Sequence, residues 1–101
     1  MGYRASLDGH CIEVVPGNLG EIALRYSGSS SEDAQQFFSD LHLPSSYPRD
    51  ASVAIKALYL LRQDVFASEQ AVAEVIVSFD DAEGLAKLVV DYCGFQLSSW
   101  R

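Results

Sequence analysis

His10 and Cys11 are the neighbouring residues whose types would suit a nucleophile and its base. A thiol becomes an effective nucleophile when a histidine takes its proton, which requires a hydrogen bond between the two side chains. These residues lie in a stretch that alternates like a β-strand, and neighbouring strand residues point to opposite faces. We therefore expect His10 to be a partly covered residue on the apolar face rather than a catalytic base.

The second cysteine, Cys93, falls on the apolar stripe of a predicted C-terminal helix. A free cysteine at such a position usually acts as a small hydrophobic residue. Nothing in the spacing requires Cys93 to meet His10. The chain has no Cys-x-x-Cys motif and no closely spaced pair of histidines, so we expect no metal site, no cofactor and no internal disulfide.

The segment Gly28-Ser29-Ser30-Ser31 precedes a predicted helix, as a phosphate-binding loop does. Glu32 and Asp33 would occupy the first helical turn and compete with an anion for the same field. One of the serines is therefore expected to cap the helix. The sequence contains neither Gly-x-x-x-x-Gly-Lys nor Gly-x-Gly-x-x-Gly, so it predicts no nucleotide-binding loop of those kinds.

Asp80, Asp81 and Glu83 form the densest group of acids and lie at the start of a predicted last helix. Acids at a helix N-terminus are stabilising because they complement the helix dipole. Glu83 also precedes Lys87 by four residues, which predicts an ion pair on the helix surface. A structural role accounts for this group, and we expect no catalytic residue in the chain.

Charge and length narrow the class of protein further. The chain has 101 residues, with 14 Asp and Glu against 7 Lys and Arg, for a net charge of -7. Because the basic residues are scattered singly, we expect binding neither to nucleic acid nor to a membrane surface. We expect neither a secretory signal nor a bilayer-spanning segment, since the longest purely apolar run, residues 57–61, is far too short to span a bilayer. We expect a single domain over residues 1–101, located in the cytoplasm, with reduced cysteines.

The N-terminal part of the sequence predicts three antiparallel strands. Asp8-Gly9 interrupts an alternating pattern and is typical of a two-residue hairpin turn. With these two residues as the loop, apolar side chains fall on one face and Arg4 lies opposite Glu13. The turn-rich segment 16–20 then leads to a third alternating stretch, Glu21–Ser27.

Three helices are predicted beyond these strands. The first begins at Glu32 and carries apolar residues at helical spacing. A linker with two prolines, residues 43–48, separates it from a second helix over about residues 50–63. The last helix follows Asp80 and stops at Gly94.

Residues 68–79 fit two patterns, a strand and a helix. The β-branched triplet Val75-Ile76-Val77 favours a strand over roughly Val72 to Phe79, and residues 95–98 predict a final strand. The result is an α+β fold, an antiparallel sheet of four to five strands with about three helices packed on it, in the order β-β-β-α-α-β-α-β. If residues 68–79 are helical, the alternative is a hairpin sheet on a helical bundle.

These features favour a small acidic, non-catalytic domain that binds another protein, as an inhibitor, an immunity-type protein or a regulatory subunit does. Its partner would carry a basic surface, and exposed edge strands leave room for a homodimer. The alternative is a small-molecule-binding regulatory domain with its ligand between the layers; an unrecognised enzyme is third. The aromatic residues that would line such a ligand site are Tyr3, Tyr26, Phe37, Phe38 and Trp100.

Partner-binding residues are expected at three places. Trp100-Arg101 follows the final strand, and aromatic residues and arginine are enriched in interface cores. Tyr47 lies in the proline-containing linker. Asp80, Asp81 and Glu83 would steer a basic partner. The competing interpretation is that Trp100 packs on the core and that the acids only complement the helix dipole.

Overall fold

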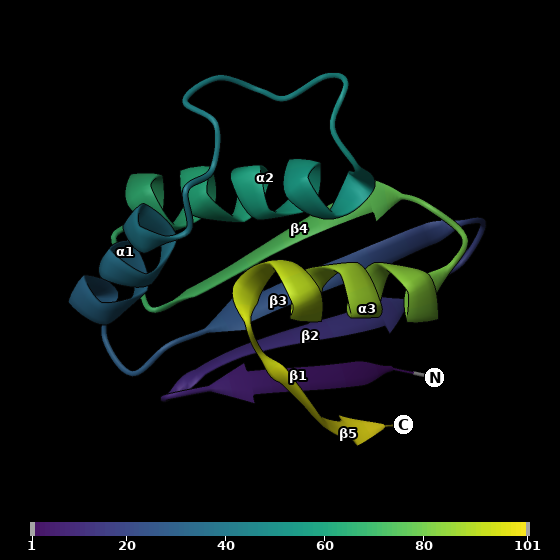
Figure 1. The fold of residues 1–101 in the computed structure, drawn as a ribbon, viewed down its shortest axis with the longest axis horizontal. Helices are drawn as coiled ribbons and strands as arrows, with labels where there is room; N and C mark the ends of the chain where they lie inside the picture. Colours follow the sequence, from purple (N-terminus) through teal and green to yellow (C-terminus); the bar gives the residue numbers. More distant parts are fainter. Residues whose placement is uncertain (1, 101) are drawn as a thin grey trace.

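The computed structural model describes the backbone of residues 2–100 and the side chains of residues 2–96. Within these residues the chain forms a five-stranded antiparallel sheet with three helices on one face (Figure 1). The elements follow one another as β-β-β-α-α-β-α-β, which confirms the predicted α+β fold. The strand order across the sheet is β4-β3-β2-β1-β5.

The first three strands form the predicted meander. β1 (Tyr3–Leu7) and β2 (His10–Pro16) are joined by the Asp8-Gly9 turn, and β3 (Glu21–Ser27) pairs with β2. Both turn residues have a positive φ, 51° at Asp8 and 85° at Gly9, as a type I′ turn requires. Every predicted pair between β1 and β2 is present. The turn chemistry and the alternation of side chains together set this register.

The stretch that fitted two patterns is a strand. β4 (Val72–Ser78) pairs antiparallel with β3, with Ala73 and Val77 turned into the core. β5 (Gln96–Trp100) pairs with β1 at the other edge of the sheet. Phe95 was expected to begin this last strand, but it precedes β5 and is buried.

Each of the three helices in the described residues begins at a side-chain cap. α1 (Ser31–Asp40) is capped by Ser30, whose side chain accepts a backbone N–H of the first turn at 3.1 Å. α3 (Ala82–Cys93) is capped by Asp81 and ends at Gly94, which has a left-handed conformation with φ 72°. The structure confirms the predicted serine cap of α1.

The middle helix, α2 (Val53–Ser68), lies later in the chain than the predicted 50–63. Ser52 caps its start, and Glu69 ends it in a left-handed conformation with φ 54°. Val65 is fully buried, so the apolar stripe continues past residue 63 and keeps the chain helical. The prediction missed this last turn because no glycine or proline marks the end of the helix.

The core lies between the helices and the inner face of the sheet. α2 lies over β4, and α3 lies over β1 and β2 (Figure 1). The largest fully buried side chains come from both layers: Ile12, Ile22, Leu24, Tyr26, Phe38, Leu58, Leu61, Val65, Leu85 and Val89. Among the described residues, no helix has the length and apolar character needed to span a bilayer. Within residues 2–100, no helix or strand covers the other face of the sheet, whose side chains include the exposed Val72 and Ile76.

Candidate functional site

An aromatic cluster fills the space between α1 and the sheet. Phe37 stacks on His10 with ring centroids 4.6 Å apart and on Tyr26 at 5.4 Å. Phe38 meets Tyr26 and Phe37 edge-on, and Phe95 packs against Phe37. Tyr26 and Phe38 are buried. The cluster therefore holds His10 in place beside the β1–β2 turn.

Tyr26 and His10 are joined by a hydrogen bond, with Oη and Nδ1 2.6 Å apart. Burial, with a smaller contribution from the Asp33 carboxylate, raises the pKa of Tyr26 to about 12, so its hydroxyl keeps its proton at neutral pH. Gly28 leaves room for this hydroxyl, because a Cβ at that position would lie 2.5 Å from Tyr26 Oη.

A pocket of about 360 Å³ lies against this cluster, between the β1–β2 turn and α1. We call it the acidic pocket. Its carboxylates come from Asp8 in the turn and from Asp33 and Asp40 on α1. Its other lining residues are His10, Gln36, Phe37, Leu41 and Cys93. Among the described residues no lysine or arginine lines the pocket, so the electrostatic potential there is negative.

Neighbouring side chains position two of these carboxylates. Ser29 Oγ donates to Asp33 at 2.7 Å, and Gln36 Nε2 donates to Asp40 at 2.9 Å. Asp40 is the last residue of α1, which has no basic residue in its last turn. A negative charge at a helix C-terminus is unfavourable. The charge of Asp40 therefore opposes the helix dipole, and its hydrogen bond with Gln36 is the stabilising contact that it makes within the helix.

Cys93 and His10 both line the acidic pocket, a proximity that no sequence spacing required. Burial raises the pKa of the Cys93 thiol to about 12, so at neutral pH it is protonated and weakly nucleophilic. Cys11 faces the other side of the sheet, as predicted from strand alternation, and burial also raises its pKa. Among the described residues, no three of the types His, Cys, Asp and Glu are placed to hold a metal ion. Burial thus leaves neither thiol activated as a nucleophile at neutral pH.

The uncovered face of the sheet carries a row of alternating charges. Four charged residues lie side by side across strands β1 to β4, and each is the register partner of the next: Arg4, Glu13, Arg25 and Glu74. Arg4 pairs with Glu13 at 2.9 Å, as its predicted register required, and Arg25 pairs with Glu74 at 2.5 Å. We call these four residues the charged row. Its two positive and two negative charges compensate one another.

Uncharged residues flank the charged row on both sides. One flank consists of Val15, Ala23 and Ile76, in register across β2, β3 and β4. The other consists of Ser6, Cys11, Ser27 and Val72, in register across β1 to β4. Ile76 is 61% exposed and Val72 54%. This face therefore presents two large apolar side chains to solvent beside a self-compensating line of charge.

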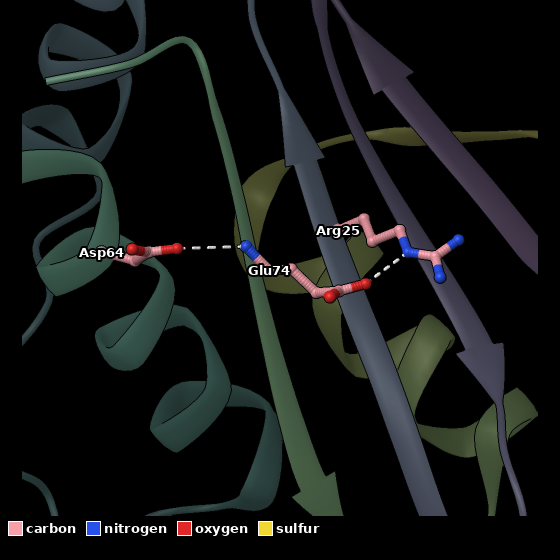
Figure 2. A network of polar contacts seen from close by, with 3 residues as sticks. All are labelled: Arg25, Asp64 and Glu74. Carbon is pink, nitrogen blue, oxygen red and sulfur yellow. Dashed lines mark hydrogen bonds and ion pairs between the residues drawn. The ribbon is translucent and has the colours of Figure 1, made fainter. Parts of the chain in front are cut away.

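Figure 2 shows how the charged row ends at the β4 edge of the sheet. The Glu74 side chain reaches Arg25, while its backbone N–H points the other way and donates to Asp64 of α2 at 3.2 Å. A pocket of about 440 Å³ is lined by all three of these residues. Asp64 thus satisfies an N–H that would otherwise be open at the sheet edge.

The described backbone places Tyr47 and Trp100, two of the predicted partner-binding residues, at opposite edges of the sheet. Tyr47 is 44% exposed, packs edge-on against Tyr59, and lines a hollow that also includes Phe79. Asp80 follows Phe79 directly, so Tyr47 and the acids before α3 share the C-terminal end of β4. Trp100 belongs by its backbone to β5, at the opposite edge of the sheet.

Two of the predicted acids have structural contacts. Asp81 Oδ1 accepts the Gly84 N–H at 2.9 Å, and Glu83 lies 3.5 Å from Lys87, as predicted. The side chain of Trp100 and all of Arg101 lie outside the described residues, so their predicted role in binding stays a prediction.

The acidic pocket was not predicted from the sequence, although one signal for it was present. Asp33, Phe37 and Asp40 recur at positions i, i+4 and i+7 of a helix, which places all three on one side of α1. The contribution of Asp8 and His10 depends on how the hairpin meets α1, which no local pattern reveals. Comparison with protein families, curated proteins and solved structures finds no match to the chain.

Proposed function

We propose that this chain is a small acidic, non-catalytic domain that binds another protein, and that the acidic pocket receives an arginine or lysine side chain of that partner. The observation that carries the proposal is a pocket that combines three carboxylates with the rings of Phe37 and His10 and has no basic residue among its described lining. Carboxylates bind a guanidinium through charge-assisted hydrogen bonds, and aromatic rings attract it through their π-systems.

The distribution of charge supports a protein partner with a basic surface. The net charge is -7, yet the charged row compensates itself on the uncovered sheet face. By contrast, α1 carries acids in its first turn and no base in its last, beside Asp8 of the turn. A surface of one sign steers an oppositely charged protein toward it. An inhibitor, an immunity-type protein or a regulatory subunit would use such a surface.

The aromatic cluster weighs against the alternative of a small molecule held between the layers. Tyr26, Phe37 and Phe38, which would line such a site, pack against one another. Their rings fill the space between α1 and the sheet. A shallow surface pocket that admits one side chain is the better match to this geometry.

The first test is an NMR titration with Nα-acetyl-arginine amide, and with the matched citrulline compound as a neutral control. We expect the arginine compound to shift the resonances of His10 and Phe37 and the citrulline compound to leave them unchanged. Asp40→Asn should weaken binding severalfold, because it removes one carboxylate charge from the pocket. It should not destabilise the fold, because it removes an unfavourable charge at the end of α1.

Asp91→Asn is the matched control, since Asp91 is an exposed acid in the last turn of α3 and lines a different hollow. It should leave arginine binding unchanged. Equal binding of the two probes, or equal effects of the two substitutions, would show that net charge alone and not the pocket is responsible. The double variant Asp33→Asn/Asp40→Asn should also lose a partner protein that the wild type captures from its host.

A further inference from the structure

We propose that two copies of this chain associate face to face through the uncovered side of the sheet, with their charged rows in contact about a two-fold axis parallel to the strands. This interface is separate from the acidic pocket, and it commits the exposed sheet face to a second copy of the same chain.

The order of charges in the charged row favours a second copy of this chain as the binding partner and determines its orientation. From β1 to β4 the row is positive, negative, positive, negative. A two-fold axis that passes between β2 and β3, parallel to the strands, places β1 against β4 of the second copy and β2 against its β3. Arg4 then faces Glu74 of the second copy, and Glu13 faces its Arg25. Every contact across the axis joins opposite charges.

Other arrangements lose this complementarity. A two-fold axis along the row, perpendicular to the strands, would place each charge against its own copy. Like charges facing each other across an interface cost several kcal/mol. The row therefore excludes one symmetric face-to-face arrangement and favours the other, which is a closed and self-complementary dimer.

The flanking residues allow the two sheets to approach. Under the favoured symmetry, Cys11 faces Ser27 of the second copy, and Val15 faces its Ala23. These small and medium side chains suit the separation of about 10 Å at which two sheets pack. Val72 and Ile76 lie on β4, one on each side of the charged row. The second copy partly covers their exposed side chains. Removal of their surface from water adds an apolar contribution.

The size of the face sets the strength of the association. Four strands about 4.8 Å apart, each up to about 24 Å long, present a face on the order of 450 Å² per copy. Two such faces give an interface at the low end of those in specific complexes. We therefore expect a reversible dimer whose population depends on protein concentration. The existing ion pairs within each copy keep every charge partnered in the interface, which limits the cost of desolvation.

The deciding experiment uses a row-reversed variant, Arg4→Glu/Glu13→Arg/Arg25→Glu/Glu74→Arg. This variant keeps alternating pairs within the chain and is again self-complementary under the proposed symmetry. Facing the wild type, however, it would oppose only like charges. Sedimentation from micromolar to millimolar concentration should show dimers of each protein alone. Native mass spectrometry of the mixture should show mixed dimers at least tenfold below the statistical proportion.

The control reverses one ion pair on α3, Glu83→Lys/Lys87→Glu, away from the sheet. This control should form mixed dimers with the wild type freely.

A second variant, Ala23→Arg, provides a test if the row-reversed protein fails to fold. Because this single change lies near the proposed axis, it should raise the dissociation constant of the dimer at least tenfold. A wild type that is monomeric throughout, or row-reversed and wild-type chains that mix statistically, would overturn the proposal. Asp40→Asn, which tests the acidic pocket, should leave dimerisation unchanged.

Discussion

The hydroxyl of Tyr26 lies so close to Gly28 that a larger residue at position 28 should lower the stability of the protein. A Cβ at Gly28 would lie 2.5 Å from Tyr26 Oη, far inside van der Waals contact. Gly28→Ala should therefore destabilise the protein by about 1–3 kcal/mol, as overpacking of a filled core does. Urea unfolding provides the measurement.

The Tyr26→Phe background supplies the control for this prediction. Without Oη, the atom nearest to the added Cβ is the ring carbon Cζ at 3.3 Å, so the cost of Gly28→Ala should fall. Gly17→Ala, where the nearest atom lies at 3.4 Å, should have a small effect. Equal costs of Gly28→Ala in the two backgrounds would mean that the hydroxyl contact is not the cause.

The raised pKa of the Cys93 thiol predicts that the folded protein loses stability in alkaline solution. Burial raises its pKa from the ordinary 9.0 to about 12 in the folded protein. Because the folded pKa is raised, the unfolded chain releases this proton first, and the contribution to stability is lost as the pH rises from 9.0 toward 12. The free energy of unfolding of the wild type should fall more steeply over this range than that of Cys93→Ala. Parallel pH curves for the two proteins would contradict the assignment.

Asp81 caps the start of α3, so a substitution that removes the cap should affect stability more than one that keeps it. Asp81 Oδ1 caps the helix through the Gly84 N–H at 2.9 Å. Asp81→Ala should cost about 1 kcal/mol of stability, whereas Asp81→Asn should cost little because asparagine caps almost as well. Thermal unfolding of the two variants checks this.

The same pair of variants separates capping from the predicted steering of a partner. If Asp81 steers a basic protein, Asp81→Asn should slow association at low salt while it keeps the fold. An unchanged association rate would leave Asp81 with its structural role alone.

The elements differed in how far local sequence determined them. The hairpin was predictable to the residue, because Asp8-Gly9 and strict alternation permit one register. The end of α2 was not, because its left-handed terminal residue is Glu69 rather than a glycine. β4 was ambiguous by periodicity, and its pairing with β3 decides it as a strand. Boundaries without a turn residue depend on tertiary packing.

At the scale of the whole molecule, the sequence showed how much charge the chain carries but not where the charge lies. The net charge of -7 and the Arg4–Glu13 pair were evident. The four-residue row was not, because it required β3 and β4 to be placed side by side. The acidic pocket likewise requires α1 to fold back onto the β1–β2 turn. Both candidate surfaces arise from contacts between elements distant in the chain.

The hydrogen bond from the Glu74 N–H to Asp64 bears on aggregation of the protein through the β4 edge at high concentration. β4 is rich in β-branched residues, and such segments at an open sheet edge recruit identical strands into fibrils. Asp64 occupies one of the outward N–H groups of β4 and adds a negative charge there (Figure 2). Because a further chain would have to displace this carboxylate in order to add a strand, we expect Asp64 to oppose strand addition at this edge.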